Sequence, residues 1–316
     1  MTERLAIADA AAVLARGGIV AFGTETVYGL GGDATNAEAV AAIFAAKERP
    51  SFDPLIVHVA DAADVHQAVA AWTPRQAMLA EAFWPGPLTM LAPRADAIPD
   101  LVTSGLPDVA VRVPGQAQAR ELIAAAGVPI AAPSANRFGR ISPTTADHVL
   151  DQLSGRIDGV LDTGPCRVGL ESTVVRVPDE GPLLVLRLGG VSLESLREVT
   201  GDVVLAADDD RAELQAETSP GRLPSHYAPR VPLRVVDEVV PDAAAGLLAW
   251  SAARPGFAAV EVLSEAGDAT EAAARLFAAM RRLDAAGVSH IVAERVPDAG
   301  LGRAINDRLH RASVRE

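Results

Sequence analysis

Short apolar runs alternate with segments of helical periodicity over the first two hundred residues of the chain. Residues 5–16 place their apolar side chains at helical spacing and end at two glycines, which suit the left-handed turn that closes a helix. Residues 37–47 repeat the pattern behind Asn36, a residue type that caps helices, and residues 116–126 predict a third helix. The apolar runs that predict strands are 19–22, 55–59, 88–92, 109–113, 128–132, 159–162, 172–177 and 183–188.

The order of these elements predicts the fold class. Helices and strands alternate in the first part of the chain, whereas strands follow one another from residue 159 onward. An α/β protein with a large, twisted, mixed sheet and helices on its faces fits this order. We expect Asp61 to cap a further helix behind the strand at 55–59, and Thr144 to cap another.

The pattern changes between residues 200 and 232. The stretch 219–229 contains three prolines and a glycine, which prevent a regular element, together with hydroxyl, imidazole and guanidinium groups. Behind it the pattern predicts a smaller, Rossmann-like α/β unit. Its strands are expected at 233–236, 246–250 and 291–293, and its helices at 270–286 and 301–312. The expected organisation is a domain over residues 1–200, a linker over 201–230 and a second domain over 231–316.

Bulk composition narrows the classes of protein. A chain of 316 residues is longer than one hydrophobic core usually organises, which agrees with two domains. The formal net charge of −13 argues against a surface that grips nucleic acid by neutralising phosphates, but it allows a local basic pocket. We expect no membrane segment, because no apolar stretch reaches spanning length. The single cysteine, Cys166, forms no disulfide within the chain, so we expect a reducing, cytoplasmic setting.

Four polar or cationic clusters follow short apolar runs in the first half of the chain. They are residues 24–31 (TETVYGLG), 47–50 (KERP), 111–114 (VRVP) and 132–136 (APSAN). Hydroxyls, an ammonium and guanidinium groups beside glycines are suited to hold a polyphosphate next to a carboxylate. We expect residues 23–32 to form a glycine-rich loop, which is not a Walker loop because the Gly-Lys-Ser/Thr ending is absent.

Most of these clusters also have a purely structural interpretation. Thr24 and Thr26 can close a turn through hydrogen bonds to the backbone. Lys47 and Arg49 can complement the dipole at the end of a helix. His58 lies on an apolar strand, where a histidine is more often a hydrogen-bonded core residue than a functional one. The sequence alone leaves these alternatives open.

Arg112 is harder to explain as packing. It lies in the apolar run 109–113, and an unpaired guanidinium in a core is strongly destabilising. Its partner is therefore either a neighbouring aspartate or glutamate, or the carboxylate of a ligand. Cys166, in contrast, has no candidate base beside it that would indicate a catalytic thiol.

Taken in order, these segments resemble the threonylcarbamoyl-AMP synthase family in its longer, two-domain form. The matching strings are 24–31 TETVYGLG, 47–50 KxRP, 54–58 PLIVH, 84–89 WPGPLT, 111–114 VRVP, 132–136 APSAN, 171–175 ESTVV and 226–229 HYAP. Near the C-terminus, residues 300–305 (GxGxAI) with Arg308 and Leu309 resemble the family's extra domain. The resemblance covers nearly the whole chain and implies a YrdC-like catalytic domain followed by a smaller C-terminal α/β domain.

The resemblance also implies an activity. Members of this family convert L-threonine, bicarbonate or CO2, and ATP into threonylcarbamoyl-AMP and pyrophosphate, with Mg²⁺ on the phosphates. Separate transferase proteins then use the product to modify an adenosine of tRNA. This chain would be a nucleotidyltransferase with small-molecule substrates, without stable binding of nucleic acid or membrane.

Roles for individual residues follow from the same resemblance. Lys47 and Arg49 would be the catalytic cations that stabilise the departing pyrophosphate. The residues that would bind L-threonine are Thr26, His58, Arg112, Ala132 and Ser172. The residues that would bind ATP are Arg49, Asp53, Ser134, Ser142, Arg187 and Tyr227. No protein side chain is assigned to Mg²⁺, which would bind through the phosphates of ATP.

Three positions depart from the family's usual pattern. Gly23 stands where proline is usual, Gln116 where histidine is common, and Asp53 where asparagine is usual. A carboxylate at residue 53 would repel phosphates unless a cation lies between them. The segment 219–229 gains a role under this interpretation, because it would fold over the site and exclude water while Tyr227 reaches the nucleotide.

Three other functions compete with this interpretation. A double-stranded RNA-binding or ribosome-maturation module without catalysis is one, since single-domain relatives have been linked to RNA, but the acidic charge disfavours it. A carbamoyl-adenylate enzyme of hydrogenase maturation is another, and the single cysteine excludes the zinc fingers that such proteins carry. A non-catalytic sensor of threonine and ATP is the third.

Overall fold

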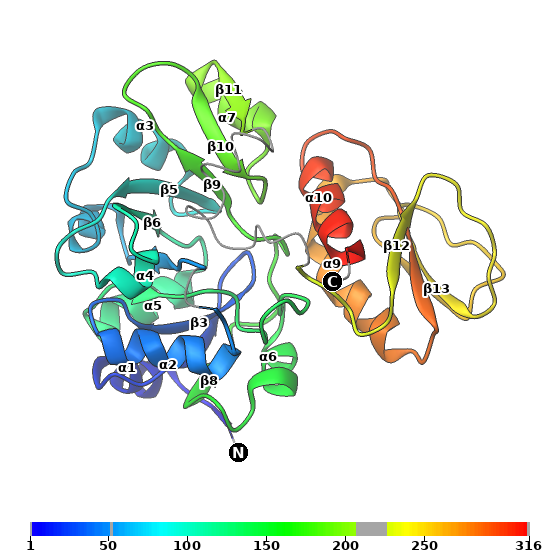
Figure 1. Cartoon of the computed structure of the whole chain (residues 1–316), viewed down its shortest axis with the longest axis horizontal. Helices are drawn as coiled ribbons and strands as arrows, with labels where there is room; N and C mark the ends of the chain where they lie inside the picture. The colour runs from blue at the N-terminus through cyan, green and yellow to red at the C-terminus, as the bar shows by residue number, and fades with distance from the viewer. Residues whose placement is uncertain (1, 51–52, 207–225, 315–316) are drawn as a thin grey trace.

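The computed structural model describes residues 2–50, 53–206 and 226–314 of the chain. These residues form a large N-terminal unit and a smaller C-terminal unit that lie side by side (Figure 1). The expected lid over 219–229 falls mostly outside the described residues, of which only its end, from His226 onward, is part.

The large unit is built on a mixed sheet. Within the described ranges it has eleven strands in the order β1-β8-β2-β3-β7-β4-β6-β5-β9-β10-β11. The strands are β1 (Glu3–Arg4), β2 (Val20–Gly23), β3 (Tyr28–Asp33), β4 (Ile56–His58), β5 (Leu88–Pro93), β6 (Asp108–Arg112), β7 (Ile130–Ala131), β8 (Gly159–Leu161), β9 (Thr173–Arg176), β10 (Leu183–Arg187) and β11 (Val203–Leu205). The sheet contains parallel pairs such as β4 with β6 and antiparallel pairs such as β2 with β3, so the predicted mixed sheet is confirmed.

Helices cover both faces of this sheet. They are α1 (Ile7–Ala15), α2 (Ala37–Lys47), the 3-10 helix η1 (Ala62–Gln67), α3 (Pro74–Phe83), α4 (Asp100–Thr103), α5 (Ala117–Ala126), α6 (Ala146–Leu153) and α7 (Leu193–Thr200). Alternate residues of β2 show the two layers: Val20 and Phe22 pack with α1 and α5, whereas Ala21 belongs to the core that includes α2 and α6. Strands buried on both faces explain the continuous apolar runs of the sequence.

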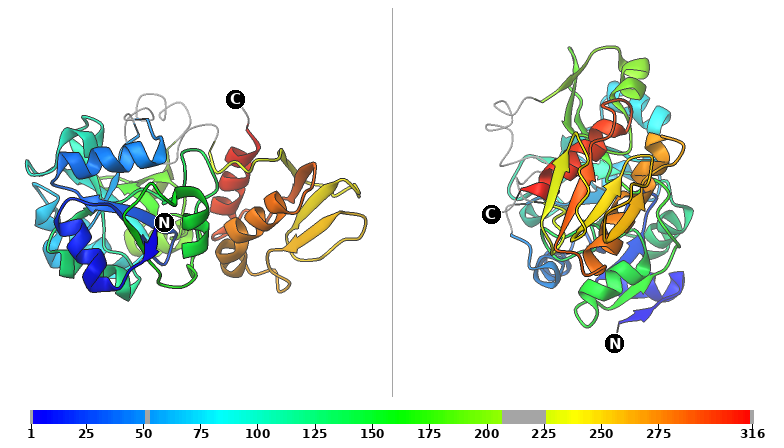
Figure 2. Two further views of the ribbon diagram at one scale, coloured as in Figure 1. Left: turned by 90° about the horizontal axis from the view of Figure 1, so that it is seen from below. Right: turned by 90° about the vertical axis from the view of Figure 1, so that its right-hand side faces the viewer.

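The small unit has a parallel sheet with helices on one face. Its strands β12 (Leu233–Val236), β13 (Ala245–Ala249), β14 (Ala259–Val262) and β15 (His290–Glu294) pair in the order β12-β15-β13-β14. Its helices are α9 (Ala269–Ala285) and α10 (Gly302–Ser313). The two helices lie between this sheet and the large unit in Figure 1 and in the left view of Figure 2. The small unit therefore meets the large one through α9 and α10.

Several local expectations are confirmed and others are corrected. Asn36 caps α2 and Asp61 caps η1, as predicted. The cap of α6 is Thr145 rather than Thr144, since the Thr145 hydroxyl accepts from His148 N. The large sheet extends to β11, beyond residue 200, and the elements α3, α7 and β14 had no expected counterpart.

Residues 28–33 form strand β3 rather than part of a glycine-rich loop. Glycines weaken strand propensity, but here close packing requires them. A Cβ on Gly31 would lie 2.6 Å from the Phe22 ring and 2.7 Å from a methyl of Ile130. The same residues that suggested a loop therefore let the sheet pack tightly at the edge of the site described below.

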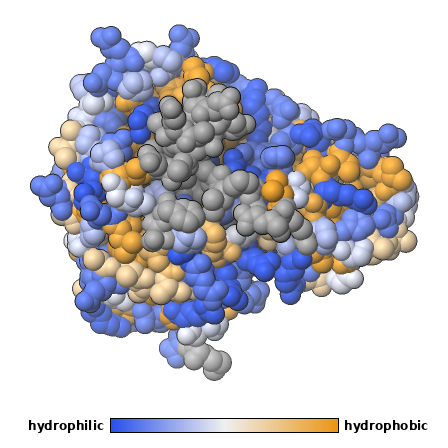
Figure 3. All heavy atoms as spheres, viewed as in Figure 1, coloured by the Kyte–Doolittle hydropathy of each residue, from blue (hydrophilic) through white to orange (hydrophobic). Residues whose placement is uncertain are grey.

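The outer surface combines hydrophilic and hydrophobic residues. On the face shown in Figure 3, hydrophilic residues occupy most of the periphery and hydrophobic residues form smaller groups between them. Among the described residues, no helix combines the length and apolar character needed to cross a membrane.

Gly169 lies where the two units touch. Its φ of +73° is in the left-handed region, and a Cβ there would lie 2.4 Å from Ala273 O and 2.5 Å from Ala274 Cα, both in α9. Gly155 shares the left-handed conformation, with φ of +79°, but has nothing within 4 Å of its Cβ position. Comparing the same substitution at Gly169 and Gly155 therefore separates the cost of backbone strain from the cost of disturbing the contact between the units.

We predict that Gly169→Ala destabilises the protein more than Gly155→Ala. Both variants carry the left-handed strain of about 1–2 kcal/mol, but only the first forces α9 away, adding a further 1–3 kcal/mol or so. Urea denaturation measures both free energies of unfolding. Equal losses in the two variants would contradict the tight contact between Gly169 and α9.

Candidate active site

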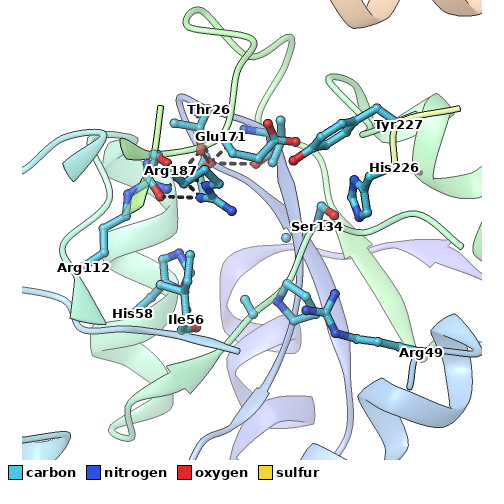
Figure 4. Close-up of a pocket in the computed structure, with 16 residues that line it drawn as sticks. Thr26, Arg49, Ile56, His58, Arg112, Ser134, Glu171, Arg187, His226 and Tyr227 are labelled. Atoms are coloured by element: carbon cyan, nitrogen blue, oxygen red, sulfur yellow. Dashed lines mark hydrogen bonds between the residues drawn. The ribbon is translucent and has the colours of Figure 1, made fainter. Parts of the chain in front are cut away.

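One pocket collects most of the polar clusters noted in the sequence. The empty space in this pocket, including the open solvent at its mouth, amounts to about 540 Å³. We call it the site pocket, and its lining residues are Thr24, Thr26, Val27, Gly29, Arg49, Ile56, His58, Arg112, Ala132, Pro133, Ser134, Glu171, Ser172, Arg187, His226 and Tyr227. Most of these residues come from the β2–β3 connection, from β3, and from β4, β6, β7 and β10 or the segments next to them, so the strand order of the large sheet brings them together, while His226 and Tyr227 follow the large sheet in the chain (Figure 4).

Arg112 forms one wall of the site pocket. Its guanidinium makes a buried ion pair with Glu25, donates to Thr26 Oγ1 at 3.0 Å and donates to Gly86 O at 3.0 Å. Glu25 also accepts from Gly115 N at 2.8 Å. The partner of Arg112 is therefore a neighbouring glutamate, the first of the two alternatives that the sequence left open. The Arg112 side chain still lines the site pocket.

The Thr24–Thr26 segment closes a turn and lines the site pocket at the same time. Thr24 Oγ1 donates to Val27 O at 2.7 Å and lies 2.7 Å from Thr26 Oγ1. The structural interpretation of these hydroxyls is thus confirmed, and both hydroxyls remain on the pocket wall.

Arg49 stands on another wall, behind the end of α2. Its guanidinium pairs with Asp53 Oδ1 at 2.8 Å and donates to the carbonyls of Asp53 and Pro54, each at 3.1 Å. Asp53 Oδ2 is buried and has no partner among the described residues. Burial raises the pKa of Asp53, while Arg49 and Lys47 oppose this shift. Arg49 therefore forms the ion pair that balances a carboxylate at residue 53.

Lys47 is almost fully buried and lies behind the pocket wall. Its ammonium donates to Asn136 O at 2.5 Å and to Ser134 O. Burial, and secondly the charge of Arg49, lower the pKa of Lys47 well below its ordinary value. Two of its three donors thus hold the loop that presents Ser134 to the pocket.

Ser172 and Arg187 adjoin each other between these walls. Arg187 Nη2 donates to Ser172 O at 2.8 Å and to Ser172 Oγ at 3.2 Å. Ser172 Oγ also lies 2.7 Å from Thr89 Oγ1. Burial lowers the pKa of Arg187, because it disfavours the charged guanidinium.

Two aromatic residues of the segment behind the undescribed stretch complete the pocket. The rings of His226 and Tyr227 meet edge to face at 4.1 Å, and Tyr227 stacks on Phe277 of α9 at 5.5 Å. Tyr227 Oη and His226 Nδ1 are buried and without a hydrogen-bond partner among the described residues. Buried polar atoms of this kind normally have a partner, so they suit a ligand that supplies one.

The charged side chains at this site carry an excess of positive charge. Among the described residues, every charged side chain that is fully buried belongs to this region. The cations are Lys47, Arg49, Arg112, Arg187 and Arg308, and the carboxylates are Glu25, Asp53 and Glu171. A surplus of two positive charges in a buried site favours an anionic ligand, since isolated buried charge is costly.

Nine of the residues proposed from the sequence line the site pocket. They are Thr26, Arg49, His58, Arg112, Ala132, Ser134, Ser172, Arg187 and Tyr227. Lys47, Asp53 and Ser142 lie one contact behind the wall, against Ser134, Arg49 and Glu171 respectively.

Sequence reasoning assigned no role to Glu25, Glu171 or His226. All three stand inside the quoted strings TETVYGLG, ESTVV and HYAP. For Glu25 and Glu171, the sequence signal that could have indicated a role was a glutamate among hydroxyl residues next to a strand. No group of three or more histidine, cysteine, aspartate or glutamate residues within the described ranges could hold a metal ion.

His58 tests the dryness of the pocket. Burial, followed by the charge of Arg112, lowers the pKa of His58 from 6.5 to about 3. Between these values the unfolded chain binds a proton that the folded protein excludes, so stability falls as the pH falls from 6.5, by up to about 1.4 kcal/mol per pH unit. We predict that His58→Asn makes the free energy of unfolding less dependent on pH between 7 and 5.

Urea denaturation at several pH values measures this slope. His66→Asn, at an exposed position, is the matched control. An unchanged slope in His58→Asn would show that His58 binds protons equally in the folded and the unfolded protein, which contradicts the lowered pKa.

Comparison with known proteins identifies the family. Residues 12–189 match the family described as "Telomere recombination", and residues 191–314 match "Threonylcarbamoyl-AMP synthase, C-terminal domain". The chain is 40% identical over 324 residues to the threonylcarbamoyl-AMP synthase of Bacillus subtilis (strain 168), covering 97% of this chain and 92% of the relative. It is 38% identical over 324 residues to that of Pyrococcus abyssi (strain GE5 / Orsay), covering 98% of this chain and 95% of the relative.

A solved structure extends the likeness to the fold. The crystal structure of P. abyssi Sua5 complexed with L-threonine superposes with a TM-score of 0.88 at 36% identity, covering 99% of this chain and 97% of that one. The resemblance stated from the motifs and the expected two-unit α/β architecture are thereby confirmed. On sequence and on structure, the chain belongs to the threonylcarbamoyl-AMP synthase family.

Proposed function

We propose that this chain is an L-threonylcarbamoyladenylate synthase. It joins L-threonine, bicarbonate or CO2, and ATP into threonylcarbamoyl-AMP and releases pyrophosphate, for threonylcarbamoyladenosine in tRNA. The observation that supports this most strongly is one pocket lined by three guanidinium groups, those of Arg49, Arg112 and Arg187, together with hydroxyls. Such an arrangement suits a polyphosphate at one end and an amino acid carboxylate at the other.

L-Threonine is proposed to bind at the Arg112 end. The guanidinium would donate hydrogen bonds to the carboxylate of the substrate, which would be its second anionic partner beside Glu25. The residues proposed to surround it are Thr26, His58, Ala132 and Ser172, all of which line the site pocket. An uncharged His58 suits this place, because it adds no positive charge beside the amine of the substrate.

ATP is proposed to bind at the Arg49 end. Arg49 and Lys47 are the proposed catalytic cations, and Asp53 acts through its ion pair with Arg49. Lys47 uses two donors on carbonyls, and its third would reach the phosphates. The remaining residues proposed to contact the nucleotide are Ser134, Ser142, Arg187 and Tyr227.

The chemistry needs no covalent intermediate with the protein. The amine of threonine attacks CO2 in its neutral form, which a dry pocket favours over ammonium, and a carbamate results. The carbamate oxygen then attacks the α-phosphorus, and the bond to pyrophosphate breaks. Positioning of the two substrates and stabilisation of charge on the leaving pyrophosphate account for the acceleration. Burial raises the pKa of Cys166, which makes this thiol a poor nucleophile.

Mg²⁺ is proposed to enter with ATP. The described residues offer no group of three or more histidine, cysteine, aspartate or glutamate side chains that could hold a metal ion. When bound, the ion neutralises charge on the triphosphate. Asp53 Oδ2, the buried oxygen without a partner, is the protein atom suited to face it.

The partners of the protein are proposed from chemistry rather than from contacts. We expect L-threonine, ATP and bicarbonate as ligands, transfer of the product to tRNA-modifying proteins, and a cytoplasmic setting. The net charge of −13 favours a protein with small-molecule ligands over an RNA-binding module. A gel shift at low salt tests the alternative, and tight, salt-sensitive RNA binding would favour it.

A pyrophosphate-release assay tests the proposed function. With L-threonine, bicarbonate and ATP together, we expect pyrophosphate and threonylcarbamoyl-AMP in equal amounts. Leaving out any one substrate should abolish the adenylate product. Binding of threonine and ATP without any product would instead identify a sensor.

Arg49→Ala should lower turnover by about 10²-fold or more, on the scale of losing one charge contact to the leaving group. Because Asp53 would then be buried without its partner, Arg49→Ala/Asp53→Asn is the variant that separates folding from catalysis. Arg137→Ala, which removes an exposed ion pair with Glu48, is the control. Wild-type turnover in the double variant would show that Arg49 stabilises no reacting charge.

Arg112→Lys should raise the KM for L-threonine at least tenfold and leave the KM for ATP nearly unchanged. Lysine keeps a positive charge opposite Glu25, but it cannot serve two carboxylates with a planar fork. Steady-state kinetics with each substrate varied in turn measures both constants. A larger effect on ATP than on threonine would reverse the proposed orientation of the substrates.

A further inference from the structure

One charged side chain of the small unit packs directly behind residues that line the site pocket. Arg308 lies in α10, and its side chain is fully buried. Its Nε donates to Glu171 Oε2 at 2.8 Å and its Nη2 donates to Leu188 O at 2.8 Å, both in the large unit. Its guanidinium carbon also lies 5.1 Å from the centre of the Tyr227 ring. Arg308 therefore contacts two residues that line the pocket, Glu171 and Tyr227.

Glu171 is the carboxylate that most needs such a partner. Unlike Glu25 and Asp53, which pair with arginines of their own unit, Glu171 has its ion-pair partner in the small unit. Its second oxygen accepts from Ser142 Oγ at 2.6 Å. Without Arg308, a buried negative charge would remain on the wall of a pocket that is to accept phosphates.

Tyr227 is held from two sides by the small unit. Its ring stacks on Phe277 of α9 and lies against the guanidinium of Arg308. A cation over an aromatic face is attractive and strongest when both groups are shielded from water. Since Tyr227 has a left-handed backbone with φ of 62°, these contacts fix a conformation that its own chain disfavours.

We propose that Arg308 is a positioning residue for nucleotide binding: it neutralises and orients Glu171 and fixes Tyr227, so the ATP end of the pocket is completed by the small unit. The inference rests on the proposed function in one respect, namely that the ligand at this end carries phosphates. It gives the C-terminal unit a role in the chemistry of the site in addition to packing.

Arg303 provides a matched comparison. It lies on the same helix and forms an ion pair across the same boundary, with Glu194 of α7. Neither residue lines the site pocket. If ion pairs between the units act only by docking them, loss of Arg303 and loss of Arg308 should have similar consequences.

The test compares Arg308→Met with Arg303→Met in the full-length protein. We expect Arg308→Met to raise the KM for ATP, and the Kd of a nonhydrolysable ATP analogue, by tenfold or more. The KM for L-threonine should stay within about twofold, and Arg303→Met should match the wild type in all three constants. Adding Glu171→Gln to Arg308→Met should recover most of the lost ATP affinity, because the amide removes the unpaired charge and still accepts from Ser142.

A purely structural role would give a different result. Equal increases for ATP and threonine, or no recovery with Glu171→Gln, would overturn the proposal, as would wild-type ATP affinity in Arg308→Met. Arg308→Lys retains the charge in the same space and should show an intermediate ATP affinity, so it replaces the methionine variant if that one does not fold. Titration of the analogue reads nucleotide affinity directly, so a wild type that binds it but makes no adenylate would refute the proposed function and leave this test intact.

Discussion

The buried surplus of positive charge is the constraint on which the rest of the site depends. A protein with a net charge of −13 concentrates five cations and three carboxylates in one buried region of its described structure. Burying charge is unfavourable unless it is paired and hydrogen-bonded. The fold must therefore supply partners for each cation, and it leaves the remaining charge for a ligand.

The partners are supplied in two ways. Arg49 and Arg112 each pair with one carboxylate, and Arg308 pairs with Glu171 and Asp307. Lys47 donates to two backbone carbonyls, and Arg187 donates to the carbonyl and the hydroxyl of Ser172. Carbonyl groups orient a cation without cancelling its charge. These contacts orient the cations before any ligand arrives, which is the preorganisation that electrostatic catalysis requires.

The sequence predicted the cations of this site better than their partners. Apolar runs ending in basic residues placed Arg49 and Arg112 at strand and helix ends, and the structure has both on the pocket wall. Two of the partners could not be predicted, because they are distant along the chain: Glu25 lies 87 residues from Arg112, and Glu171 lies 137 residues from Arg308, whereas Asp53 is at i+4 from Arg49. Strand β3 was missed for a related reason, since its glycines signal a loop locally and are explained only by the packing of Phe22 and Ile130. Local pattern determines elements, whereas pairing of charges across the fold is a property of topology.

The surplus charge can be measured directly by what the pocket prefers to bind. Calorimetric titration of the wild-type protein with a nonhydrolysable ATP analogue and, separately, with adenosine compares the same base with and without its phosphates. If the buried cations form a preorganised anion site, the analogue should bind at least about a hundredfold more tightly, which corresponds to roughly 2.7 kcal/mol. Equal affinities for the two ligands would contradict the account, because the phosphates would then gain nothing from the buried cations.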